Sequence, residues 1–186
     1  LSSAAAPLPS SFVNDPSNAS NLSNGTLCST CAYTQWGYWG GAVNSNFGGG
    51  GPRSDFGHLN FWVAGQPTVN LPTMGTGLYN GGMIGSVNNS GLQYIATGNF
   101  NLNYDFGART GSFGINTFDG QSPITVPVGA VGAGYSGVKG ASGPGLSATI
   151  AGGFFGPNSP LPPETAGSFS LFKSGYQAAG VFQGHR

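Results

Sequence analysis

The feature that most constrains the fold is a run of alternating side chains between Gln93 and Phe106. Every second residue from Tyr94 onward is aromatic, aliphatic or glycine, the residues between them are polar, and Ile95 is the single exception. A period of two is the pattern of a β-strand with one buried face. At about 3.4 Å per residue the run can extend over more than about 40 Å. It therefore predicts either one long barrel strand or two strands bent at Gly98.

Turn signals connect this run to its neighbours. The residues Asn88-Asn-Ser-Gly91 precede it and predict a hairpin with the run Gly77 to Val87. The residues Gly107-Ala-Arg109 follow it and can reverse the chain into Thr110 to Phe118. Three consecutive strands joined by hairpins make a meander.

The remainder of the body consists of short aromatic and β-branched runs separated by Gly, Asn and Pro. No long glycine-free stretch carries apolar residues at helical spacing, so the body is predicted to be all-β. Residues 126–139 are interpreted as a long connection with room for one more short strand. The further strands predicted are Tyr33 to Val43, Leu59 to Ala64, Leu146 to Phe155, Ala166 to Phe172 and Ala178 to Gln183. Together these runs make about eight strands.

Aromatic side chains on both faces of several strands favour a closed barrel over an open sandwich. Closure also hides edge strands, which this chain does not protect with charge, because it has only five basic and five acidic residues among 186. Its 35 glycines suit strands that coil sharply or lie under an aromatic ring. We predict an antiparallel up-and-down β-barrel of about eight strands over residues 32–186. Its predicted aromatic core is Trp36, Tyr38, Phe61, Phe100, Tyr104, Phe113, Phe154, Phe169 and Phe182.

Residues 1–31 are predicted to form an extended tail or linker that ends in Cys28-Ser-Thr-Cys31. The tail is rich in Ser, Asn and Pro and has neither a helical nor a strand period. Its apolar residues Phe12, Val13 and Leu22 form a candidate assembly segment. Two arrangements remain open: the tail packs on a neighbouring subunit, or it lies along its own barrel.

Four interpretations of the cysteine pair compete. A haem attachment site would need His at position 32, which is Ala32. A structural zinc site needs four ligands, and the only histidines, His58 and His185, lie at unrelated positions. A redox pair needs a helix N-terminus, whereas a strand is predicted to follow Cys31. The sequence favours a short-range disulfide between Cys28 and Cys31.

The small and balanced charge excludes several functions. A net charge of zero and the lack of a Lys or Arg cluster argue against nucleic-acid binding. No apolar run approaches the roughly 18 residues of a transmembrane helix. The segment Gly132 to Gly137 matches a dinucleotide-binding fingerprint, but the residues after it cannot form the helix that such a site needs. Asp55 and His58 could pair as orienting acid and general base, but on a strand they would point to opposite faces. No catalytic residue, metal site or cofactor is therefore predicted, and we expect a protein that is not an enzyme.

Three segments carry a resemblance to a known family: residues 151–158 (AGGFFGPN), 164–171 (ETAGSFSL) and 178–184 (AAGVFQG). They resemble the end of the barrel domain of transferrin-binding protein B, factor H-binding protein and related Gram-negative surface lipoproteins. The likeness extends over roughly residues 75–186. Residues 33–41 resemble the start of such a barrel at the end of FecR-type surface polypeptides. The resemblance implies an eight-stranded barrel on or outside a Gram-negative cell, used for binding and not for catalysis.

This sequence departs from those lipoproteins in its few charges and its single barrel, so no partner-contacting residue is carried over. Two functions are predicted as alternatives. The first is an extracellular or cell-surface module that binds a protein partner through the loops 44–53 and 121–145. The second is a structural subunit that binds copies of itself in a surface filament or coat through its tail.

Overall fold

The computed structural model describes residues 27–45, 53–142 and 145–186, with side chains described outside 40–59. The described residues form strands joined by turns and loops and include no helix. The strands are β1 (Thr34–Ser45), β2 (Arg53–Gly65), β3 (Thr76–Asn89), β4 (Leu92–Asp105), β5 (Thr110–Phe118), β6 (Ile124–Val131), β7 (Gly134–Lys139), β8 (Ser147–Phe155), β9 (Glu164–Lys173) and β10 (Tyr176–His185).

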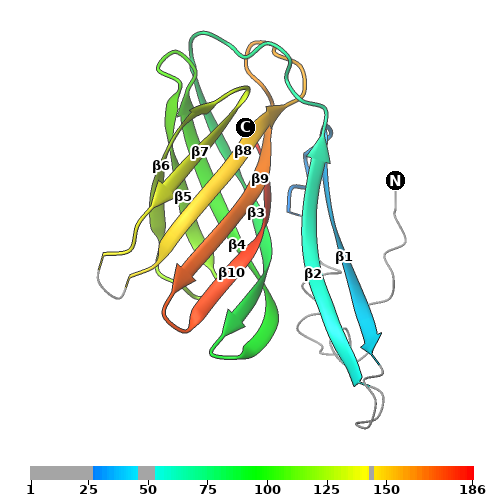
Figure 1. Cartoon of the computed structure of the whole chain (residues 1–186). Coiled ribbons are helices and arrows are strands. Elements are labelled where there is room, and N and C mark those ends of the chain that lie inside the picture. Colours follow the sequence, from blue (N-terminus) through cyan, green and yellow to red (C-terminus); the bar gives the residue numbers. More distant parts are fainter. Residues whose placement is uncertain (1–26, 46–52, 143–144) are drawn as a thin grey trace.

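Eight of these strands close into an antiparallel barrel in the order β10-β3-β4-β5-β6-β7-β8-β9 (Figure 1). Each strand pairs with the next along the chain, and β10 returns to β3, so the topology is up-and-down. The predicted fold class is therefore confirmed. Closure leaves no barrel edge unpaired, which is consistent with the shortage of protective charge.

The long alternating run forms one strand, β4, and not two. β4 pairs with β3 in an unbroken register from Thr76↔Asp105 to Asn89↔Leu92, and its pairing with β5 shifts once, between Asn99 and Phe100. Gly98 lies beside this bulge, where an added Cβ would collide with the backbone of β5. Glycine at this position permits the close approach of two strands on the barrel wall.

The prediction of a long connection over residues 126–139, with room for one short strand, is wrong, because β7 and most of β6 of the barrel lie within these residues. In β6 the residues Ile124, Val126 and Val128 alternate into the core. The turn to β7 contains Gly132 at φ 56°, a backbone conformation that suits glycine. The glycines of this segment therefore serve a tight turn between two short strands, and the region proposed as a recognition loop is largely barrel wall.

The strands β1 and β2 form a separate hairpin beside the barrel (Figure 1). Trp36, Tyr38 and Phe61 therefore lie on this hairpin and not in the barrel interior. The physical reason is that β10 pairs along its whole length with residues 80–89 of β3, so the barrel closes without a place for the hairpin in its wall. Aromatic residues on both faces of β1 are explained by the hairpin having one face against the barrel and one face away from it.

The barrel interior is filled by aromatic rings that contact one another. Phe100 and Phe113 stack with centroids 4.9 Å apart, and Phe182 meets both rings edge-on at 5.0 and 4.8 Å. Tyr104 and Phe154 lie with centroids 4.9 Å apart. Such pairs add to the stabilisation from burial of apolar area. The six barrel residues of the predicted aromatic core, Phe100, Tyr104, Phe113, Phe154, Phe169 and Phe182, are all buried.

Candidate interaction surface

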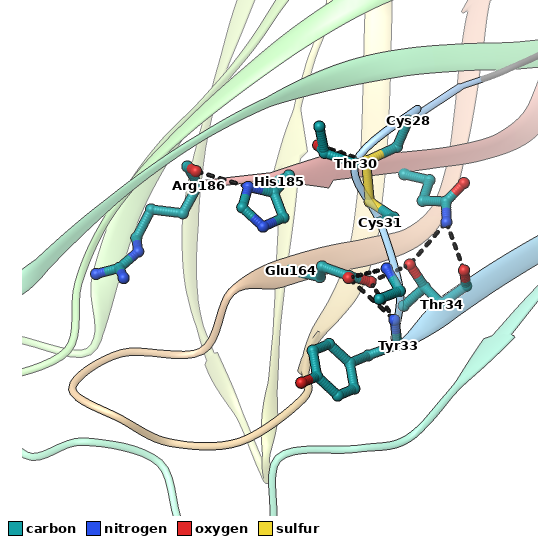
Figure 2. Close-up of a disulfide and its surroundings, with 10 residues drawn as sticks. Cys28, Thr30, Cys31, Tyr33, Thr34, Glu164, His185 and Arg186 are labelled. Carbon is teal, nitrogen blue, oxygen red and sulfur yellow. Dashed lines mark hydrogen bonds between the residues drawn. A yellow bond between two sulfur atoms is a disulfide. The ribbon is translucent and has the colours of Figure 1, made fainter.

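A buried carboxylate fixes the start of the hairpin to the barrel. Glu164, the first residue of β9, is 0% exposed. Its carboxylate accepts hydrogen bonds from the backbone N–H groups of Ala32 and Tyr33 and from the Thr34 hydroxyl at 2.6 Å (Figure 2). His185 is its register partner on β10 and makes its own hydrogen bond to the Arg186 carbonyl. Burial of a carboxylate is costly unless donors surround it, and here three donors of one segment do so.

The barrel holds the same segment from β10 as well. The Gln183 amide donates to the Thr34 carbonyl and hydroxyl oxygens at 2.8 and 2.7 Å, and both residues are buried. Glu164 and Gln183 thus bind the first residue of β1 and the two residues before it through side chains of two neighbouring barrel strands. We call this set of contacts the latch.

The structure contains the disulfide between Cys28 and Cys31, directly before the latch (Figure 2). On the other side of the disulfide, the Leu27 carbonyl accepts a hydrogen bond of 2.8 Å from the Gly82 N–H of β3. An added Cβ at Gly82 would crowd the Leu27 backbone. The disulfide loop is therefore anchored to the barrel on both sides and sets the direction in which β1 leaves it.

The inner face of the hairpin packs on the outside of the barrel. Trp36, Phe61 and Val63 cover a small apolar cluster on the outer wall that also includes Leu27. The wall residues of this cluster are Ile84 of β3, Ile95 of β4 and Val181 of β10. Ile95, the one exception in the alternating run, is thereby explained, because it points outward under the hairpin and is 2% exposed.

The outer face of the hairpin carries two tryptophans. Gly37 pairs with Trp62, and Trp39 pairs with Asn60, so both indoles lie on the face opposite Trp36. Trp62 lies across Gly37, where an added Cβ would collide with the indole ring. Trp39 is 53% exposed. We call this face, with Gln35, Gly37, Trp39, Asn60, Trp62 and Ala64, the tryptophan face.

The barrel end opposite the latch contains a polar group of side chains. The Tyr94 hydroxyl donates to the Asp119 carboxylate at 2.7 Å, and the Lys173 ammonium donates to the Gln121 amide oxygen at 2.7 Å. The Tyr176 hydroxyl is buried and makes no hydrogen bond within the described residues. Burial, and then the nearby Asp119 charge, raise the pKa of Tyr176, although the geometry between the two groups falls short of a hydrogen bond.

The remaining predicted sites fall in different places. Phe12, Val13 and Leu22 lie outside the described residues, and so do most of the loop 44–53 and the side chains of Asp55 and His58. Within the described ranges, no three His, Cys, Asp or Glu residues gather as metal ligands. No helix in this part of the chain is long and apolar enough to cross a membrane. The latch and the tryptophan face were not predicted as sites. The one sequence signal is the pattern W-G-Y-W at residues 36–39, which lies in β1 and points to the tryptophan face; no pattern points to the latch.

The fold and this surface define a class: a closed eight-stranded up-and-down barrel with a latched hairpin on its outer wall. Solved structures of transferrin-binding protein B have a similar fold. The protein from Haemophilus parasuis aligns over 84% of this chain with a TM-score of 0.58 and 18% identity. The protein from Neisseria meningitidis also aligns over 84% of this chain, with a TM-score of 0.53 and 21% identity. The structure of a surface lipoprotein aligns with a TM-score of 0.54 and 14% identity, and the alignment covers 84% of this chain and 78% of the lipoprotein chain.

These similarities confirm the predicted resemblance at the level of the fold. This chain spans about a third of the transferrin-binding protein B chains, 34% and 35% of the two compared. No protein-family model and no curated protein matches the sequence. The relation to FecR-type polypeptides stays a prediction.

Proposed function

We propose that the chain is a non-catalytic module on the surface of, or outside, a Gram-negative bacterium, and that it binds a protein partner through the tryptophan face. The fold of bacterial surface proteins, one of them named for binding transferrin, supports the setting and the class of function. Fold alone does not specify a partner, so the surface itself has to support the site.

The observation that carries this proposal is Trp39, a large side chain that is 53% exposed on a strand and not on a loop. Tryptophan is enriched among the residues that dominate binding energy at protein interfaces. Trp62 lies over Gly37 on the same face as Trp39, so the two indoles offer a broad apolar area, and the packed Trp62 has little side-chain freedom to lose.

The latch supports the same function by fixing the position of the hairpin. A binding surface loses less entropy on association when it is already held in its bound geometry. Glu164 and Gln183 hold the start of β1, and the cluster under Trp36 holds its inner face. The tryptophan face is thus presented on a rigid scaffold.

A non-catalytic role is also supported by the described titratable groups. Glu164 is committed to the latch, Asp119 to Tyr94, and the His185 ring to the Arg186 carbonyl. Glu164 and His185, an acid and a base, are register partners on β9 and β10, but each side chain bonds to other groups. The alternative of a filament assembled through the N-terminal tail gains no support, because the tail lies outside the described residues.

The experiment is a binding assay with the whole chain immobilised against a panel of purified extracellular host proteins that includes transferrin. We expect saturable binding of one member, and Trp39→Ser should weaken it at least about tenfold, which is about 1.4 kcal/mol. The matched control is Leu92→Ser, which removes a side chain that is 68% exposed on β4 of the barrel. Binding that tolerates Trp39→Ser but not Leu92→Ser would place the site elsewhere, and no binding across the panel would remove the support for the proposal.

A further inference from the structure

We infer that the outer edge of β1 pairs with the same edge of a second copy of this chain. The direction of the backbone groups identifies the edge. The Gln66 N–H donates to the Tyr33 carbonyl, and Thr34 pairs with Gly65. In an antiparallel ladder the residues alternate in the side to which their backbone groups point. The Tyr33 carbonyl therefore points toward β2, although the Tyr33 N–H, before the strand begins, bonds to Glu164. The backbone groups of Thr34, Trp36 and Tyr38 point to the outer edge.

The first part of this edge is already occupied by barrel side chains. The Thr34 carbonyl, which points outward, accepts the hydrogen bond from Gln183. Beyond it, no described residue bonds to the outward N–H and C=O groups of Trp36 and Tyr38, and β2 is the only described strand that pairs with β1. With respect to the described residues, the edge is thus capped at Thr34, where the hairpin leaves the barrel, and open at Trp36 and Tyr38.

Among the described residues, the only device against pairing that this open edge carries is the irregularity beyond Trp39. The strand Thr34–Ser45 contains no charged residue and no proline. Monomeric proteins usually protect such an edge with lysine, proline, a covering loop or a very short strand. β1 has a register shift between Trp39 and Gly41, which leaves the stretch from Thr34 to Trp39 regular. Strand β2 differs, since its sequence includes Arg53, Asp55 and His58.

A second copy is the occupant that this charge pattern fits. Pairing of β1 with itself puts no like charges opposite each other, because the strand has none. The whole chain has five basic and five acidic residues, so two copies do not repel at long range. An antiparallel pair of identical edges is self-complementary under a two-fold axis. The product is a four-stranded sheet, β2-β1-β1-β2, that joins two tryptophan faces into one surface.

This inference goes beyond the proposed function and does not depend on it. A chain that binds its partner as a monomer would refute the edge pairing and leave the tryptophan face intact.

The test is the mass of the purified whole chain in solution, by sedimentation or light scattering, over a concentration series. We expect a dimer of twice 18.7 kDa. Tyr38→Pro removes an outward N–H that the β1–β2 ladder does not use, and Tyr38→Ala is its matched control with the N–H kept. Tyr38→Pro should raise the dimer dissociation constant at least about tenfold relative to Tyr38→Ala.

A second pair of variants keeps the inference testable if Tyr38→Pro does not fold. When the open groups of Trp36 in one copy pair with those of Tyr38 in the other, the exposed Gln35 lies opposite the exposed Trp39 of the second copy. We therefore expect a mixture of Gln35→Lys and Trp39→Glu to form a tighter dimer than either variant alone. The inference would be overturned if the wild-type chain keeps the mass of a monomer at concentrations up to about 100 µM, because specific dimers have dissociation constants of about micromolar or lower. It would also be overturned by a dimer equally stable in all variants, or by a monomeric chain whose edge binds only an added foreign peptide.

Discussion

Glu164→Ala should release the hairpin from the barrel without unfolding the barrel. The substitution removes the acceptor of three hydrogen bonds at the latch, from Ala32, Tyr33 and Thr34. It removes nothing from the barrel interior, because this carboxylate points to the outer wall. The expected result is a hairpin that detaches at a lower denaturant concentration than the barrel unfolds.

The magnitude follows from the contacts. Hydrogen bonds to a charged acceptor contribute about 1.5–3 kcal/mol each. Full addition would overestimate the loss, since water reaches the exposed Ala32 and the buried carboxylate itself bears a desolvation cost. We therefore expect Glu164→Ala to weaken docking by about 3–4 kcal/mol, which is about a hundredfold to a thousandfold in the docked population. Glu164→Gln keeps an acceptor but not its charge and should cost about 1–2 kcal/mol.

The chain provides separate probes for its two parts. All three tryptophans, Trp36, Trp39 and Trp62, lie on the hairpin, and the barrel strands contain tyrosine but no tryptophan. Tryptophan fluorescence in urea therefore reports hairpin docking, and far-ultraviolet circular dichroism reports mainly the barrel. In wild type the two transitions should coincide or nearly so, and in Glu164→Ala the fluorescence transition should move to lower urea.

The matched control is Ser170→Ala, an exposed position on the same strand and the same outer wall. It should leave both transitions in place. The reasoning would be refuted if the fluorescence transition of Glu164→Ala matched that of wild type, because the latch would then contribute nothing to docking.

Three further predictions concern the barrel. Burial raises the pKa of Tyr135 above its ordinary value of 10.0, so this tyrosine ionises in the unfolded state at a lower pH than in the folded state. The free energy of unfolding should therefore fall above pH 10, by up to about 1.4 kcal/mol per pH unit for this group. In urea titrations from pH 9 to 11, the decline of the free energy of unfolding with pH should be shallower in Tyr135→Phe. At neutral pH, Tyr135→Phe should cost about 1 kcal/mol, because its hydroxyl bonds a buried threonine at 2.7 Å. Tyr176→Phe should be neutral or stabilising, because no described residue forms a hydrogen bond with its hydroxyl. The reverse order in urea midpoints would contradict this. Gly98→Ala forces a Cβ into the backbone of β5 and should lower the free energy of unfolding by more than about 3 kcal/mol, measured by thermal unfolding. Gly129→Ala is its control, because the added Cβ meets nothing within 4 Å and should change stability by less than about 1 kcal/mol. Equal effects of the two substitutions would contradict the packing account.

The barrel was within reach of sequence reasoning because its information is local. Alternation from Tyr94 to Phe106 specifies a strand with one buried face, and the turn at Asn88 to Gly91 specifies its partner. In β6 and β7 the short strands and the glycines around Gly132 weaken the same signal, so the two strands resemble a connection.

The hairpin and the latch depend on contacts that no local pattern encodes. A strand with aromatic residues on both faces fits a barrel wall and a hairpin packed on a barrel equally well, so Trp36 and Tyr38 do not separate the two. Glu164 bonds residues more than 100 positions away in the chain. Ile95 is the one residue whose position in the pattern carried a hint, since an apolar side chain on a polar face implies that something covers it.

The central claim, that the tryptophan face binds a protein partner, is tested most directly by fluorine NMR of the chain labelled with 5-fluorotryptophan. The three tryptophans give three signals, which single substitutions assign, and the unlabelled partner contributes none. On addition of the partner from the binding assay, the signals of Trp39 and Trp62 should shift or broaden, and that of Trp36, under the hairpin, should stay in place. Saturable binding that leaves the Trp39 and Trp62 signals unchanged would contradict the claim.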